Sequence, residues 1–106
     1  MADFLGLMKQ AAELKSKMEA MQAELDQIDV EGSSGAGRVT VRLSGKGAMK
    51  GVKIDPSLIK PEEMEIVEDL IVAAHADARR KAESLLQEKM KTVTGGLPLP
   101  PGLKLF

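Results

Sequence analysis

The first 28 residues carry apolar side chains at alternating spacings of three and four residues. Such heptad spacing places one continuous apolar seam along a helix. The pattern predicts a helix over residues 3–29, about 37 Å long at about 1.5 Å per residue. We expect the seam to pack against another helix. A full-length parallel coiled coil is the less favoured alternative, because the seam carries Met and Ala where a strong zipper has Ile and Leu. The seam residues are Phe4, Leu7, Ala11, Leu14, Met18, Met21, Leu25 and Ile28.

The middle of the chain alternates apolar and polar side chains with the period of a strand. The alternating apolar residues are Val39, Val41, Leu43, Val52 and Ile54. A further short strand is expected near Val30, and the glycine clusters supply the positive φ angles of tight turns. The pattern therefore predicts a small three-stranded antiparallel sheet over residues 30–58, with a hairpin turn at Gly45–Gly47.

A second apolar stripe predicts a helix over residues 61–94. Pro61 suits the first turn of a helix, and the glutamates that follow it complement the positive end of the helix dipole. Ala74, Ala78 and Ala82 are expected to allow close approach of another helix, and Gly95 and Gly96 to end this one. The apolar residues are Val67, Leu70, Ile71, Ala74, Ala78, Ala82, Leu85, Leu86 and Val93.

These elements predict an α+β fold of order α-β-β-β-α in a single domain of residues 1–106. Two long antiparallel helices flank the sheet, and a proline-rich tail over residues 95–106 is either disordered or docked on a helix or a partner. The sheet is too small to bury its own apolar face. We therefore expect its valines to face the sheet of a second chain, which predicts a homodimer joined through the sheets.

Composition excludes several classes of protein. The chain has 106 residues and no cysteine, which rules out disulfides and cysteine nucleophiles. Phe4 and Phe106 are its only aromatic residues, which argues against base-stacking modules for RNA or single strands. No segment has the length and apolarity of a membrane span or the pattern of a signal peptide, so the cytoplasm is the expected compartment.

The sequence gives little basis for an enzyme. The glycine-rich stretch before Arg38 lacks the Gly-Lys-Ser/Thr ending of a phosphate loop and leads into a strand. His75 is the only histidine, and we interpret it as a boundary residue on the flank of the second helix's stripe. Without a nucleophile–base pair, a metal cluster or a cofactor loop, we expect no catalytic residue, metal, cofactor or small-molecule substrate.

Charge is segregated along a chain whose net charge is −1. Residues 61–77 carry six acids and no base, whereas residues 78–106 carry six bases and two acids. If the two helices pack antiparallel, their acidic ends lie near the sheet, and the lysines of the first helix lie beside the bases of the second, far from the sheet. This predicts an arm with a basic distal half, formed by Lys9, Lys15, Lys17, Arg79, Arg80, Lys81, Lys89 and Lys91.

Five stretches in this order resemble the YbaB/EbfC family of bacterial nucleoid-associated proteins: residues 7–11, 32–37, 52–58, 68–70 and 99–102. The resemblance implies a tweezers-like α-β-β-β-α dimer that binds double-stranded DNA with its helical arms. It also implies roles in nucleoid organisation and gene regulation, and a location on the nucleoid. Carried onto this chain, the DNA-binding regions are those around Lys9 to Lys17 and Arg79 to Lys91.

Two alternatives stay open at this point. The basic positions of the sheet, which are Arg38, Arg42, Lys50 and Lys53, form a second candidate surface for DNA. The chain could also be a dimeric scaffold or adapter that holds a protein partner through its arms and apolar tail.

Overall fold

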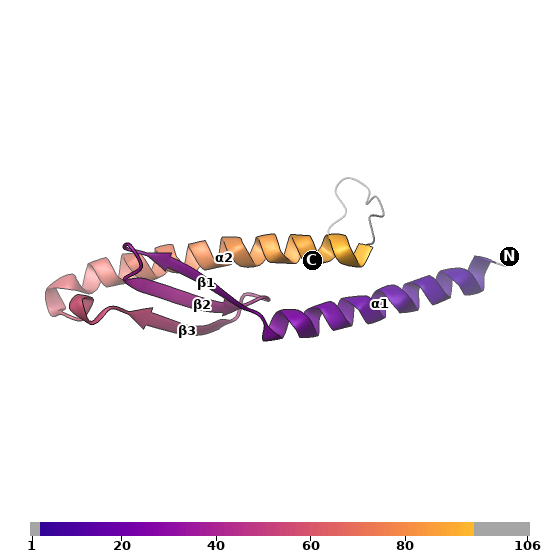
Figure 1. Ribbon diagram of the computed structural model, residues 1–106, viewed down its shortest axis with the longest axis horizontal. Helices are drawn as coiled ribbons and strands as arrows, with labels where there is room; N and C mark the ends of the chain where they lie inside the picture. Colours follow the sequence, from indigo (N-terminus) through magenta and orange to yellow (C-terminus); the bar gives the residue numbers. More distant parts are fainter. Residues whose placement is uncertain (1–2, 95–106) are drawn as a thin grey trace.

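The computed structural model describes residues 3–94 of the chain and confirms the α+β fold (Figure 1). The predicted order of one helix, three strands and a second long helix is observed. The molecule is elongated, with extents of 71 × 26 × 16 Å. Its elements are α1 (Asp3–Gln27), β1 (Asp29–Ser34), β2 (Val39–Ser44), β3 (Met49–Ile54), two short 3-10 turns (Pro56–Leu58 and Pro61–Glu63) and α2 (Met64–Thr94).

The element boundaries differ slightly from the predicted ones. The first helix ends at Gln27, and Asp29 already belongs to β1. Pro61 opens a 3-10 turn, and the α-helix proper begins at Met64. The predictions for the proline-rich tail, residues 95–106, lie outside the described residues.

The three strands form an antiparallel sheet in the order β1-β2-β3. Val41 of the central strand pairs with Gly32 on one side and with Val52 on the other. Residues that pair directly across an antiparallel sheet share a face. One face therefore carries the alternating valines, and the other carries the charged and polar side chains between them.

The valine face is covered by α2 of the same chain. Val39, Val41 and Leu43 are fully buried against Ala74 and Ala78. The expectation that this face needs the sheet of a second chain is therefore wrong. The sequence predicts that Ala74 and Ala78 contact another helix, whereas in the structure they pack on the sheet.

Small residues set how closely α2 approaches the sheet. A Cβ atom added to Gly32 would lie 2.1 Å from the backbone nitrogen of Ala78 and 2.3 Å from the carbonyl oxygen of Ala74. The alanine run thus serves a contact between a helix and a strand, and only Ala82 lies at the junction with α1. A glycine inside a strand often marks such a close backbone approach, and this was the signal in the sequence.

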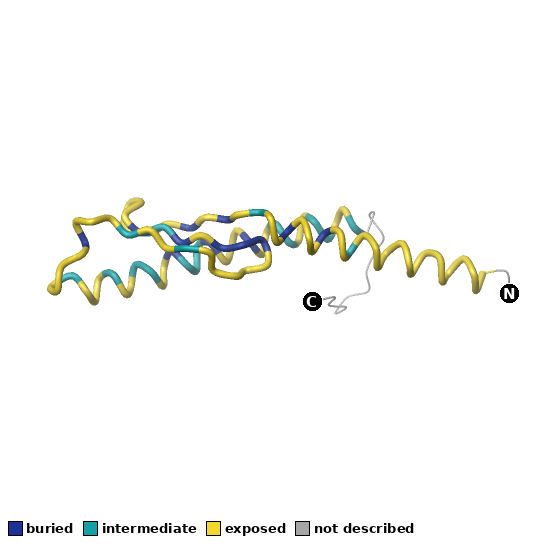
Figure 2. Tube along the Cα trace, turned by 90° about the horizontal axis from the view of Figure 1, so that it is seen from below, coloured by how far each residue is buried: buried dark blue, intermediate teal, exposed yellow. Residues whose placement is uncertain are grey.

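The two halves of α1 have different surroundings. Met21 and Leu25 are buried at its C-terminal end, next to α2 and the hairpin between β2 and β3. Every residue from Asp3 to Lys17 is exposed, and Figure 2 shows this segment extending alone beyond the rest of the molecule. The predicted packing of the seam against a helix is therefore confirmed for its C-terminal half, and its N-terminal half has no partner within residues 3–94.

Candidate nucleic-acid interface

The predicted DNA-binding residues fall into two groups in the structure. Lys9, Lys15 and Lys17 lie on the exposed segment of α1, and the other five lie on α2. The predicted arm, in which all of them lie together far from the sheet, is not observed. The helix α2 begins at the far end of the sheet and crosses it before it reaches α1 (Figure 1).

Arg79, Arg80 and Lys81 lie beside the sheet, which corrects the predicted position. The Lys81 ammonium donates a hydrogen bond to the carbonyl oxygen of Glu31 in β1, at 3.1 Å. Their placement follows from the contact of Ala78 with Gly32, which holds this turn of α2 against β1. The acidic start of α2 and the acidic end of α1 lie at opposite ends of the sheet for the same reason.

Asp77 connects these bases to the sheet. Its carboxylate accepts a hydrogen bond from the backbone N–H of Ser33 at 3.0 Å, and it forms ion pairs with Arg80 at 3.2 Å and Lys81 at 3.3 Å. The Ser33 hydrogen bond and then Lys81 hold the pKa of Asp77 below its ordinary value. Nothing in the sequence distinguishes Asp77 from the other acids of α2, so this role was not predicted.

Two further bases on α2 are paired with acids. Arg79 lies 3.3 Å from Glu83, one turn further along the helix. Lys89 pairs with Glu24 of α1 and so connects the two helices. Because these cations already have acidic partners, DNA phosphates would have to compete with the acids or share the cation with them.

The lysines of α1 form no ion pair with any residue between 3 and 94. In the heptad that contains Phe4 and Leu7, Lys9 occupies the side of the helix opposite the seam, and Lys15 and Lys17 flank the seam. Lys9 therefore points away from whatever covers the seam.

Only some of the basic residues of the sheet are available to a DNA phosphate, because others already form ion pairs. Asp29 pairs with Lys50 at 2.8 Å and with Arg42 at 3.9 Å. The hydrogen bond from Lys50 holds the pKa of Asp29 below its ordinary value. Lys53 is exposed and lines a polar hollow of about 300 Å³ on the outer face of the sheet, together with Arg42. This second candidate surface thus mixes paired and unpaired cations.

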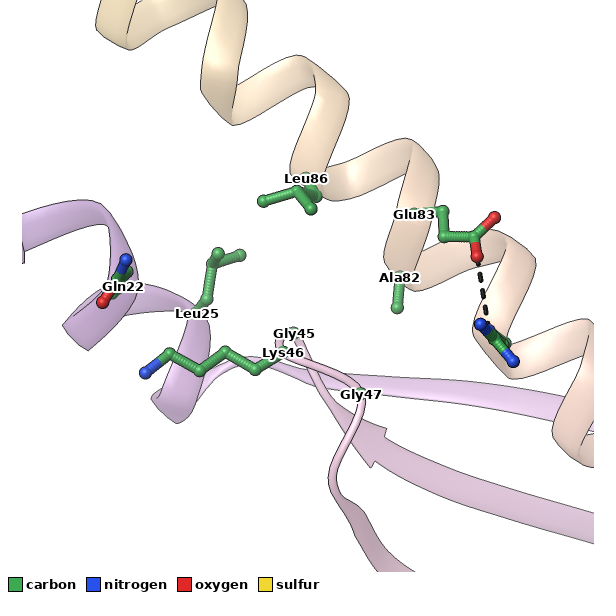
Figure 3. A pocket seen from close by; sticks show the side chains of 9 residues that line it. Gln22, Leu25, Gly45, Lys46, Gly47, Ala82, Glu83 and Leu86 are labelled. Carbon is green, nitrogen blue, oxygen red and sulfur yellow. Dashed lines mark ion pairs between the residues drawn. The ribbon is translucent and has the colours of Figure 1, made fainter. Parts of the chain in front are cut away.

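A hollow of about 500 Å³ lies where α1, α2 and the hairpin between β2 and β3 meet (Figure 3). Leu25 and Leu86 extend into it from the two helices, and Arg79 lies on its rim with its Glu83 partner. Lys46, on the hairpin, pairs with Asp26 at 3.2 Å. An apolar floor with a charge-paired rim suits packing better than the capture of an anion.

Two other kinds of site are not found among residues 3–94. Neither of the two helices is long and apolar enough to cross a membrane. In this part of the chain, no group of three His, Asp or Glu side chains lies close enough to hold a metal ion. His75 is half-buried on the flank of α2, as predicted.

Comparisons with known proteins agree with the resemblance seen in the sequence. The model of the YbaB/EbfC DNA-binding family matches residues 1–97. A nucleoid-associated protein of Rhodopseudomonas palustris is 70% identical over 105 residues, 99% of each chain. Another, from Nitrobacter winogradskyi, is 69% identical over 103 residues, 97% of each chain. A crystal structure of an uncharacterized Helicobacter pylori protein shares the fold, with a TM-score of 0.79 and 22% identity over 88% of this chain and 98% of that one.

Proposed function

Because this chain belongs to the YbaB/EbfC DNA-binding family, we propose that it is a nucleoid-associated protein that binds double-stranded DNA as a homodimer. The observation that carries the proposal is the family match over residues 1–97, with named relatives that align over almost the whole chain. On this proposal the protein acts on the nucleoid in the cytoplasm, where it helps to organise DNA and to regulate genes. It performs no catalysis.

The proposed contacts are electrostatic. Lysine and arginine side chains that neutralise phosphates release counterions, and this supplies most of the affinity of binding that does not depend on DNA sequence. We propose the bases of α1 and α2 for this role. They are Lys9, Lys15, Lys17, Arg79, Arg80, Lys81, Lys89 and Lys91.

The ion pairs rank these bases. Lys9 has no acidic partner among the described residues, so its full positive charge is available to a DNA phosphate. Arg79 pairs with Glu83 and Lys89 with Glu24, so each gives up an acid or shares its charge when it binds DNA. Lys9 should therefore contribute more to affinity per residue than Arg79 or Lys89.

The test is a fluorescence anisotropy titration of a duplex of about 30 base pairs at several salt concentrations. Binding through phosphates predicts a steep negative slope of log affinity against log salt, and each lost contact flattens the slope by about 1. The proposed homodimer carries each base twice, so neutralising Lys9 and Arg80 together should flatten the slope by up to about 4. Affinity for unrelated duplexes should fall by the same factor, because phosphates carry no sequence information.

The matched control neutralises two bases of the sheet, Arg38 and Arg42. A greater loss of affinity in this variant would move the proposed surface from the helices to the sheet. If neither the wild-type protein nor any variant binds the duplex at low salt, the proposal fails. The exposed apolar side chains of α1 would then favour the alternative function, a scaffold that holds a protein partner.

A further inference from the structure

The hollow where α1, α2 and the hairpin meet has an apolar interior that the described part of the chain leaves unfilled. Its volume is about 500 Å³. Pockets of about 300–1,000 Å³ hold compact ligands. Leu25 and Leu86 extend into the hollow from the two helices, and Ala82 lies on the α2 side (Figure 3). Gly45 and Gly47 form the hairpin side and bring no side chain. The hollow therefore has room for a few apolar side chains from another segment.

The rim of this hollow is electrically balanced, because both of its bases have an acid beside them. Lys46 pairs with Asp26 at 3.2 Å. Arg79 pairs with Glu83 at 3.3 Å. A polyanion such as DNA would have to compete with these acids, whereas an apolar segment with few charges leaves both ion pairs in place. The chemistry of the hollow therefore suits an apolar peptide.

The chain carries such a peptide shortly after α2. Residues 97–106 read Leu-Pro-Leu-Pro-Pro-Gly-Leu-Lys-Leu-Phe, and Lys104 is their only charged side chain. Prolines favour the polyproline II helix, in which residues three apart lie on the same edge. One such edge would be entirely apolar and would consist of Leu97, Pro100, Leu103 and Phe106.

We propose that residues 97–106 turn back along α2 and bind in this hollow of their own chain, with Leu103 packed against Leu86. The Gly-Gly pair at residues 95–96 directly follows α2, where the reversal is needed. Glycine adopts the positive φ angles of a sharp reversal at little steric cost. The sequence thus provides the turn as well as the apolar edge.

The length of the tail agrees with this position. Measured along α2, Thr94 lies about 12 Å from Leu86 and about 18 Å from Ala82, at about 1.5 Å per residue. A polyproline II segment covers about 3.1 Å per residue, so the returning chain reaches these positions about four to six residues after the glycines and Leu97. Leu103 is the leucine at that distance.

The tail is too short to reach the other apolar hollow of the same chain. That hollow, of about 340 Å³, is lined by Ile59 and Met64. Met64 and Thr94 are the two ends of α2, and they lie about 45 Å apart at about 1.5 Å per residue. Residues 95–106 span about 37 Å in the polyproline II form. Reach therefore favours the hollow beside α1.

Cross-linking within one chain tests the contact, because the chain has no cysteine of its own. Glu83→Cys places a thiol on the rim of the hollow. Lys104→Cys places one beside Leu103 and removes no apolar residue. In the double variant, a short bis-maleimide should join the two thiols, and the product should migrate as a compact monomer on a denaturing gel.

Ser84→Cys is the matched control for Glu83→Cys. Ser84 is the next residue of α2, is equally classed as exposed, and lines a hollow on another face of the helix. Internal linking to Lys104→Cys should be at least tenfold faster from position 83 than from position 84. Equal rates would mean that the tail has no preferred face of α2 and would overturn the inference.

A mixture of the two single variants, Glu83→Cys and Lys104→Cys, shows which chain the tail binds. We expect little covalent dimer from this mixture. A dimer formed as fast as the internal link would place the tail on a second copy and would overturn the inference. Docking of the tail in its own chain requires neither DNA nor a second copy, so this test and the duplex titration can fail independently.

A change in the tail tests whether apolar contact holds it. Adding Leu103→Ser to the double variant should remove the tenfold advantage of position 83, because serine lacks the side chain that fills the hollow. Leu105→Ser, on another edge of a polyproline II helix, should retain it. Both changes lie outside the described helices and strands, so the fold should persist in each. An advantage that survives Leu103→Ser would overturn the proposed contact.

Discussion

The two halves of α1 share one sequence pattern and differ in what surrounds them. The same spacing of three and four runs from Phe4 to Ile28. At its C-terminal end the seam is buried, with Leu25 2% exposed, whereas Phe4 at the other end is 66% exposed. Periodicity therefore identifies which face of a helix will be covered. It does not say whether the cover comes from the same chain.

The helix α2 sharpens this contrast. It buries small residues, Ala74 and Ala78, against a strand, whereas the exposed half of α1 presents large ones. Alanine and glycine let two backbones approach closely and specify a tight fit within one chain. Large apolar side chains in an exposed stripe are typical of a contact with another molecule.

The strongest test of the tight fit is Gly32→Ala. The new methyl group would lie 2.1 Å from the Ala78 nitrogen, so α2 must move away from β1. We expect a loss of about 3 kcal/mol or more in the free energy of unfolding, at the upper end of overpacking effects. Urea denaturation followed by circular dichroism measures it.

The matched control for that change is Gly6→Ala in the exposed half of α1. A Cβ atom at Gly6 meets nothing within 4 Å, and alanine favours a helix over glycine by about 1 kcal/mol. This variant should gain helicity and lose no stability. Equal destabilisation by the two changes would remove the distinction between the two regions.

A moderate effect should separate the two ends of the α1 seam. Leu25→Ala removes a buried side chain and should cost about 2–3 kcal/mol, toward the lower end for such changes because the site borders a hollow. Leu7→Ala should leave the unfolding free energy of the dilute monomer within about 0.5 kcal/mol.

The smallest expected effect concerns Asp77 and acid. Its pKa is lowered in the folded state, so the stability that its charge contributes is present above the ordinary value of 3.8 and is lost as the pH falls through the lower, folded-state value. Asp77→Asn can still accept the Ser33 hydrogen bond but cannot lose a charge. It should therefore flatten the decline in unfolding free energy below about pH 4.

Asp69→Asn serves as the control for this prediction, because Asp69 is exposed and has no ion pair within residues 3–94. Denaturant titrations at several pH values would compare the two variants with the wild type. If the acid dependence of Asp77→Asn equals that of the wild type, the link from α2 to β1 does not depend on this charge.

Much of the fold could be predicted because its signals are local. Alternating Val39, Val41 and Leu43 defined the central strand, and Pro56 marked the end of the last one. The position of Arg79 to Lys81 could not be predicted in the same way. It depends on Ala78 resting on Gly32, two residues far apart in the sequence whose contact is a property of the assembled fold.

The candidate site shows the same limit. The exposure of the α1 lysines follows from the sequence pattern, because residues 3–17 pack against no other part of residues 3–94. Counting charges could not show that Asp77 and Glu83 partly neutralise the bases of α2. Ion pairs depend on which side chains are in contact in the folded protein. The net charge of each segment carries no information on those contacts.

The attachment of α1 at Gly45 has a mechanical consequence. The Gly45 N–H donates to the carbonyl oxygens of both Leu25 and Ile28, at 2.9 and 3.0 Å, and ties the root of α1 to the hairpin. The helix runs about 33 Å from Leu25 to its first residue, Asp3, at about 1.5 Å per residue. A rotation of about 10° at Leu25 therefore moves the N-terminal end by about 6 Å over that length. Small changes in the backbone around Gly45 therefore produce large displacements of the N-terminal end of α1.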